Sequence, residues 1–138
     1  MPAILLDTGA LYALADRDDA WHARMKSLLE EHPGPLLLPI TVLPEACYML
    51  NTHLGQEAER ALLAACASGR FTVVSTTVED IVRSIELLDL YADSNLGFVD
   101  ASVVAIAERL GVRQIATTDR RDFSLVRPRH CSALELLP

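Results

Sequence analysis

The sequence predicts an α/β domain in which a mainly parallel β-sheet is covered by helices on both faces, a three-layer α/β/α sandwich. Short apolar runs alternate with longer segments whose apolar residues recur at helical spacing, and capping or turn residues separate them. Of the 138 residues, 51% are hydrophobic and only 5% are aromatic, which is typical of a folded globular domain. We expect one domain, residues 1–138, because this length leaves no room for a second.

The chain opens with one expected strand and two expected helices. The apolar run Ala3–Leu6 ends at Asp7 and predicts a buried strand. Thr8 can cap a helix that ends before the acidic cluster at 16–19. From 20 to 31 apolar residues return at helical spacing, and a Pro-Gly-Pro sequence then ends this second helix.

The same alternation continues through the middle of the chain. Leu36–Leu38 predicts a second strand, and Thr41 caps a helix in which Pro44 is tolerated because it lies in the first turn. Gly55 separates this helix from the next, which we expect from Glu57 to Ala67.

A third strand, Phe71–Val74, precedes a clear helix start. Thr77 and Asp80 have the spacing of a capping box, with Asp in place of Glu. The amphipathic pattern of this helix assigns its buried face to four residues: Ile81, Ile85, Leu88 and Tyr91.

The last elements are one helix and two strands. We expect the helix from about Val99 to Leu110, where Gly111 ends it. Ile115 and Ala116 predict a fourth strand, and a final short strand lies within 133–137.

The acidic residues of this sequence follow the predicted strands. Asp7 and Asp119 each come directly after a strand, and Glu45 lies early in the helix after the second strand. The carboxyl ends of parallel strands meet at one edge of the sheet, so we expect these three side chains to converge there. Asp100 begins the helix before the fourth strand, which places it at this edge or at the opposite one.

Such a cluster needs cations. Two carboxylates about 4 Å apart repel each other by about 4 kcal/mol at an effective dielectric constant of 20. Lys26, the only lysine, lies far from the acids in the sequence, and Mg²⁺ or Mn²⁺ prefers oxygen ligands. Each acid taken alone has a structural alternative, since Asp and Glu also stabilise helix starts and turns.

The net charge of −7 by itself argues against nucleic-acid binding, which uses basic side chains. However, eleven of the twelve basic residues are arginines, which bind phosphate in a bidentate manner. The one dense basic stretch could steer RNA toward the acids or could be ordinary solvated surface; it contains Arg120, Arg121, Arg127 and Arg129.

Four segments together resemble the PIN-domain family, and most of all its VapC-type toxins. They are Leu5-Leu6-Asp7-Thr8, Glu45, Phe98-Val99-Asp100-Ala101 and the stretch from Ala116 to Phe123. The likeness extends from Ile4 to about Arg129, and it depends on the order and spacing of the segments rather than on any single motif.

The resemblance implies a flavodoxin-like fold and a metal-dependent endoribonuclease site. It implies that Asp7, Glu45, Asp100 and Asp119 form the catalytic and metal-binding set, with Thr8 and Thr118 as supporting hydroxyls. It also implies inhibition by a small antitoxin protein, as in a type II toxin-antitoxin pair. Asp122 is either a further acid at the rim of the site or a turn residue before Phe123.

We expect one or two Mg²⁺ or Mn²⁺ ions to activate water for in-line attack on an RNA phosphodiester, which leaves 5′-phosphate and 3′-hydroxyl ends. An aspartyl-phosphate enzyme is disfavoured, because Gly9 stands where such sites need a second Asp and no lysine occurs late in the chain. Two alternatives stay open: a PIN nuclease that processes RNA without a toxin role, and a PIN-like binding or assembly module without turnover.

The remaining expectations concern location and assembly. The first residues lack the basic region of a signal peptide, no apolar run is long enough to span a membrane, and the three cysteines show no metal or disulfide spacing. We therefore expect a cytoplasmic protein. Apolar faces on five residues favour a homodimer; these are Leu11, Leu14, Trp21, Met49 and Leu54.

Overall fold

The computed structural model describes residues 1–138, which form five strands and seven helices. The strands are β1 (Ile4–Leu6), β2 (Leu36–Pro39), β3 (Thr72–Val74), β4 (Gln114–Ala116) and β5 (Glu135–Leu137). The helices are α1 (Thr8–Ala15), α2 (His22–Glu31), α3 (Val42–Leu54), α4 (Gln56–Ala67), α5 (Val78–Leu90), α6 (Phe98–Leu110) and α7 (Arg120–Leu125). All the expected elements are present, and α7 is additional.

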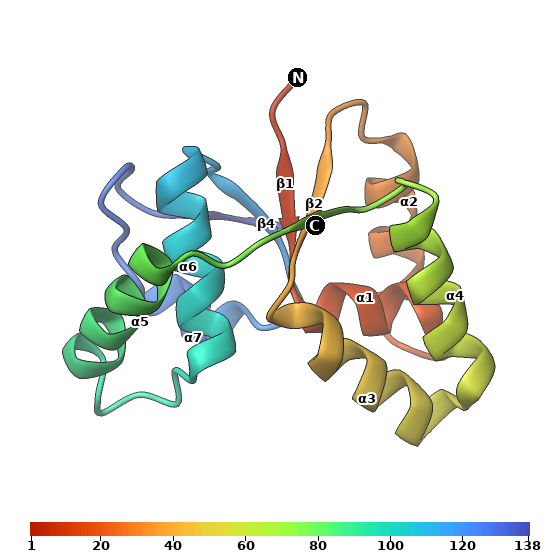
Figure 1. The fold of residues 1–138 in the computed structure, drawn as a ribbon. Coiled ribbons are helices and arrows are strands. Elements are labelled where there is room, and N and C mark those ends of the chain that lie inside the picture. Colours follow the sequence, from red (N-terminus) through yellow and green to blue (C-terminus); the bar gives the residue numbers. More distant parts are fainter.

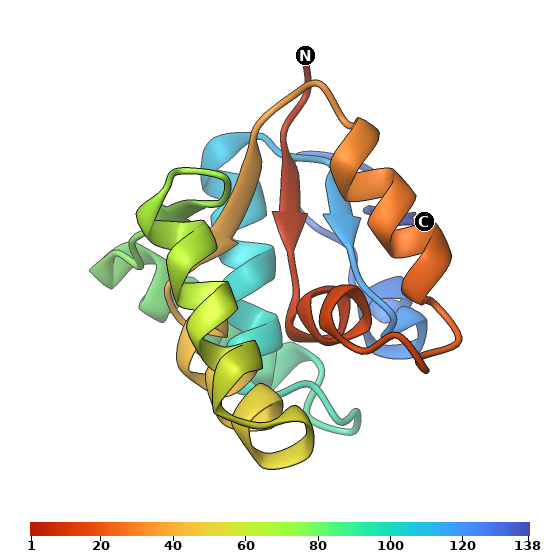
Figure 2. The same cartoon turned by 90° about the vertical axis from the view of Figure 1, so that its right-hand side faces the viewer.

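All five strands run parallel in the order β3-β2-β1-β4-β5. Leu5 of β1 pairs with Leu37 of β2 on one side and with Ile115 of β4 on the other. The arrowheads of β1, β2 and β4 accordingly point the same way in Figure 2. The chain order reverses on either side of β1, and ligands bind at such a switch point in open parallel sheets.

Helices cover both faces of the sheet, so the predicted α/β/α sandwich is confirmed. Figure 1 shows α1 to α4 on one side of the sheet and α5 to α7 on the other. The longest helices have 13 residues, and none combines the length and apolar character that a bilayer crossing requires.

The core lies at β1, β4 and α6. Every residue of β1 is buried, as is the continuous stretch 101–107 of α6. A helix that is buried all round needs apolar or small residues on every face, and this stretch supplies them with Ala, Val, Ile and one Ser. The hydroxyl of that residue, Ser102, lies 2.6 Å from the hydroxyl of Thr41, so Thr41 links the start of α3 to α6 rather than capping its own helix.

The face of α5 that packs against the core agrees with the predicted one only in part, because Leu88 and Tyr91 pack against the core but Ile81 and Ile85 do not. Asp80, Ser84 and Leu87 are buried, whereas Ile81 and Ile85 are 44% and 55% exposed. The reason is electrostatic. Arg109 of α6 binds the Asp80 carboxylate at 3.0 Å, and the predicted Thr77–Asp80 capping box forms, so the helix turns this polar side inward.

Candidate active site

The acidic side chains gather at the carboxyl edge of the sheet. Asp7 follows β1 and is the N-cap residue of α1, and Asp119 follows β4 and is the N-cap residue of α7. Asp100 lies in the first turn of α6. The sequence did not decide which edge of the sheet Asp100 occupies. The structure places Asp100 at the same edge as Asp7 and Asp119, because α6 starts at this edge and ends at Gly111, near the start of β4.

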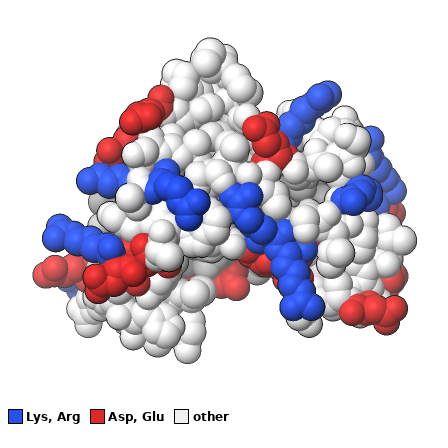
Figure 3. All heavy atoms as spheres, turned by 180° about the vertical axis from the view of Figure 1, so that it is seen from behind, with Lys and Arg blue, Asp and Glu red and all other residues white.

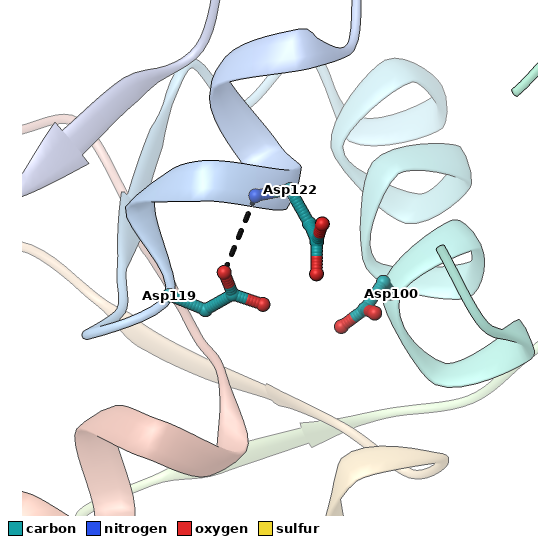
Figure 4. Close-up of side chains that lie close together, drawn as sticks. All are labelled: Asp100, Asp119 and Asp122. Atoms are coloured by element: carbon teal, nitrogen blue, oxygen red, sulfur yellow. Dashed lines mark hydrogen bonds between the residues drawn. The ribbon is translucent and has the colours of Figure 1, made fainter. Parts of the chain in front are cut away.

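Three carboxylates face one another across a gap between α6 and α7. One oxygen each from Asp100, Asp119 and Asp122 lies within 4.8 Å of the others, and all three side chains are half-buried. Figure 4 shows them pointing toward a common centre. The Asp122 amide donates a 3.2 Å hydrogen bond to Asp119 Oδ1, which fixes the first turn of α7 and holds the two carboxylates together.

Asp7 forms the buried floor beside this cluster and is only 4% exposed. Burial raises its pKa to about 6; hydrogen bonds from the Thr8 amide and the Thr117 hydroxyl oppose this rise, and the charges of Asp119 and Glu45 add to it. A buried carboxyl with raised pKa at a strand end is a feature of functional sites.

The pKa values of the clustered acids are raised as well. Burial raises the pKa of Asp100 to about 7, and the neighbouring charge of Asp7 contributes next, ahead of Asp119 and Asp122. Burial and the charge of Asp119 raise the pKa of Asp122. Burial is the largest cause of both rises, the neighbouring acids add to them, and the charge of Arg121 only partly opposes the rise at Asp122.

Glu45 stands at the rim rather than inside the cluster. It lies in the first turn of α3, is exposed, and accepts a 2.9 Å hydrogen bond from the Thr8 hydroxyl. The Thr8 hydroxyl therefore contacts Glu45, and this contact places Thr8 beside one of the predicted acids.

The hydroxyl that contacts Asp7 belongs to Thr117, not to Thr118. Thr117 is fully buried, donates to Asp7 Oδ2 at 3.0 Å, and accepts from the Asp119 amide at 2.9 Å. Thr118, the residue named by resemblance, instead places its hydroxyl against Gly9, so closely that an added Cβ there would collide with it. Ala116 pairs with Leu6 in the sheet, and this register sets Thr117 beside Asp7.

The four basic residues near α7 differ in what they contact. Arg120 lies over the Trp21 ring, with its guanidinium carbon 4.9 Å from the ring centre, and also donates to the Pro138 carbonyl. Arg127 donates to backbone carbonyls, and Arg129 forms a 2.8 Å ion pair with Glu86. Arg121 alone has no hydrogen bond or ion pair within the protein for its guanidinium. On the face shown in Figure 3, basic side chains border a hollow that contains acidic ones.

The donor set suits a hard divalent cation. Asp100, Asp119 and Asp122 supply carboxylate oxygens only, Asp7 and Glu45 lie next to them, and no lysine is near. Oxygen ligands of this kind fit Mg²⁺ and Mn²⁺ rather than a metal that prefers His or Cys. The sequence alone does not predict α7, so it identifies Asp122 only as a secondary candidate. The available signal was that Asp122 lies three residues after Asp119, a residue type that caps helices.

Comparisons with known proteins identify the family of this chain. The PIN domain family matches residues 4–127. The chain is 31% identical over 125 residues to "Ribonuclease VapC26" of Mycobacterium tuberculosis, which covers 91% of this chain and 93% of that protein. It is 29% identical over 121 residues to "23S rRNA-specific endonuclease VapC20" of the same organism, covering 88% of this chain and 92% of the relative.

Solved structures show the same fold. The crystal structure of Mycobacterium tuberculosis VapC20, described as a sarcin-ricin loop cleaving toxin, superposes with a TM-score of 0.83 at 27% identity, covering 94% of this chain and 98% of that one. A toxin-antitoxin complex from Klebsiella pneumoniae superposes with a TM-score of 0.68 at 21% identity, covering 88% and 90%.

Proposed function

Since the chain belongs to the PIN-domain family and is a ribonuclease of the VapC type, we propose that Asp7, Asp100, Asp119 and Asp122, with Glu45 at the rim, hold its catalytic divalent ions. The observation that supports this most is the approach of three carboxylate oxygens to within 4.8 Å, with no ion pair to any of the three. The ion is Mg²⁺ or Mn²⁺, and the site takes one or two of them.

The chain's own residues prepare the site in three ways. Asp100, Asp119 and Asp122 concentrate negative charge that attracts the cation, and their half-burial limits competing water. Thr117 holds Asp7 and the start of α7 in register, and Thr8 orients Glu45. A bound ion supplies Lewis acidity, which stabilises charge on the scissile phosphate and lowers the pKa of the attacking water. The products carry 5′-phosphate and 3′-hydroxyl ends.

The test is incubation of purified protein and total RNA with Mg²⁺ or Mn²⁺, with and without EDTA, followed by mapping of the cut ends. We expect cleavage that EDTA abolishes and that Asp100→Asn eliminates without loss of fold. A chain that binds Mn²⁺ but leaves RNA intact would instead be the metal-holding assembly module.

We further propose that the substrate is RNA in the cytoplasm and that a small antitoxin protein inhibits the enzyme. The relatives' names support this, because one is called a 23S rRNA-specific endonuclease and one neighbouring fold was solved as a toxin-antitoxin complex. Growth arrest on expression, relieved by the product of a short adjoining reading frame, separates a toxin from an RNA-processing nuclease.

A groove beside α4 offers such a partner an apolar surface. It has a volume of about 250 Å³, and nine of its ten lining residues are hydrophobic. Leu11, Leu62 and Phe71 among them are buried, and Ala15 and Ala61 are exposed. Ala61→Arg should weaken the antitoxin complex and leave RNA cleavage unchanged.

A homodimer is also proposed, on different residues from those the sequence suggested. Leu11 is buried, and Leu14, Trp21 and Met49 are half-buried, so these four do not form a free surface. Of the five residues that the sequence suggested, only Leu54 is exposed, at 37%. Exposed apolar side chains lie instead on α5, where Val78, Val82 and Ile85 are each more than half exposed. Light scattering of the wild type and of Val82→Glu tests the proposal, and a monomeric wild type contradicts it.

A further inference from the structure

A second hollow adjoins the acidic cluster and is lined by polar residues. It has a volume of about 490 Å³ and lies between the loop that joins α5 to α6 and the helix α7. Asp122 lines it and belongs to the acidic cluster as well, so the hollow opens directly beside the proposed reaction centre. Tyr91, Asp93 and Asn95 line it from the loop, and Arg121 lines it from α7.

The loop side of this groove is held in one shape by hydrogen bonds. The Ser94 hydroxyl donates to the Tyr91 carbonyl at 2.7 Å and accepts from the Leu96 amide at 3.1 Å. The Tyr91 hydroxyl accepts from the Arg127 amide at 2.9 Å, which fixes the ring against the segment after α7. The side chains of Asp93 and Asn95 take part in no hydrogen bond within the protein, so their polar atoms are free for a ligand.

The groove carries a positive charge on its α7 side and a negative charge on its loop side. Arg121 is the only cation that lines it, and it is also the one basic residue of the α7 region whose guanidinium has no hydrogen bond or ion pair. Its charge acts on the neighbouring Asp122, where it opposes the rise in the pKa of that carboxyl. Asp93 brings a carboxylate from the opposite wall. A phosphate would be repelled by Asp93 and attracted by Arg121, whereas an amino group on a base would be attracted by Asp93.

From this arrangement, and on the basis of the proposed nuclease function, we infer that the groove binds the unpaired nucleotide next to the scissile phosphate. Arg121 binds a phosphate of that nucleotide. Asp93 accepts a hydrogen bond from the amino group of its base, and Tyr91 and Asn95 border the base. Proteins read single-stranded RNA through such base edges, because a paired base has no free Watson–Crick edge. The groove therefore favours adenine, cytosine or guanine over uracil, which alone has no amino group.

The test measures binding, so it does not require cleavage. Two labelled hexanucleotide RNAs are compared by fluorescence anisotropy in EDTA at low salt, one of alternating C and A and one of U only. We expect the wild type to prefer the C/A oligonucleotide by at least about 5-fold. Asp93→Ala should abolish this preference. Arg121→Gln should weaken the binding of both oligonucleotides equally and reduce the slope of log affinity against log salt by about 0.7.

The matched control is Arg113→Gln, because Arg113 is exposed and precedes β4 at the opposite edge of the sheet. It should leave both affinities unchanged. Equal affinity of the wild type for the two oligonucleotides, or an Arg121→Gln variant that binds like the wild type, would overturn the inference. A wild type that cleaves RNA, with Asp93→Ala cutting at the same sites and rates, would also overturn it and leave the nuclease proposal standing. Binding as expected without cleavage would contradict only the nuclease proposal.

Discussion

The Thr117 hydroxyl donates a 3.0 Å hydrogen bond to the Asp7 carboxylate across 110 residues of sequence, and both side chains are buried. The same hydroxyl accepts from the Asp119 amide at 2.9 Å, so one side chain connects the floor of the site to the start of α7. The hydrogen bond lowers the pKa of Asp7 against the effect of burial.

Thr117→Val should therefore weaken metal binding and stability together. It removes the hydroxyl and keeps the shape, which leaves a buried carboxylate with one donor fewer and costs about 1–3 kcal/mol. Calorimetric titration with Mn²⁺ and thermal melts in EDTA measure the two effects. Thr118→Val is the control, since its hydroxyl makes no hydrogen bond; equal behaviour of both variants would show that Thr117 has no special role.

Asp122 and Glu45 should differ in their contribution to metal affinity. Asp122 lies within 4.8 Å of two other carboxylates, whereas Glu45 is exposed at the rim and bonded to Thr8. Asp122→Asn should lower Mn²⁺ affinity about 10-fold or more, since it removes a ligand charge at close range. Glu45→Gln should lower it less and act mainly on the cleavage rate. Calorimetric titration of both variants with Mn²⁺ measures the two affinities. A larger loss of affinity for Glu45→Gln than for Asp122→Asn would mean that the ion lies nearer Glu45.

The sequence predicted the strands and most helices because their signals are local. Apolar runs such as Leu36–Leu38 and the capping box at Thr77 are visible without tertiary contacts. The convergence of Asp7 and Asp119 was also predictable, because parallel strands bring their carboxyl ends to one edge.

What the sequence could not provide depends on contacts between distant elements. The choice of Thr117 over Thr118 follows from the register of β4 against β1, which no local pattern encodes. The inward face of α5 depends on the ion pair between Asp80 and Arg109 of α6, and an amphipathic pattern alone selects Ile81 and Ile85 instead. The six residues of α7 are too few to show helical periodicity.

Gly9 should be intolerant of a side chain although it is helical. A Cβ at this position would collide with the Thr118 hydroxyl and push the segment that carries Thr117 and Asp119. Gly9→Ala should thus lower Mn²⁺ affinity and cleavage, even though alanine favours a helix by up to about 1 kcal/mol. Gly97→Ala is the matched control because nothing lies within 4 Å of an added Cβ there. A fully active Gly9→Ala enzyme would show that the segment moves freely.

The metal-free protein should become less stable as pH rises from 5 to 8. The pKa of Asp7 is about 6 in the folded chain and about 3.8 ordinarily, so between these values the folded state holds a proton that the unfolded state has lost. The free energy of unfolding then falls with rising pH, and the loss is complete above about 6 for Asp7 and above about 7 for Asp100. Asp7 alone accounts for a loss on the order of 1–2 kcal/mol across this range.

The pKa values of Asp80 and Glu108 are lowered by their arginine partners, against the effect of burial, so these acids stay ionised at pH 5 and do not offset the trend. Thermal melts in EDTA should give a lower Tm at pH 8 than at pH 5. Mn²⁺ should restore the Tm at pH 8, because it binds the folded state and neutralises the cluster. Asp7→Asn should make the EDTA profile less steep, because Asp100 still contributes to the slope. An EDTA profile that is level or rises toward pH 8 would mean that burial and neighbouring charge do not raise the pKa values of Asp7 and Asp100. The electrostatic case for a metal at this edge would then fail.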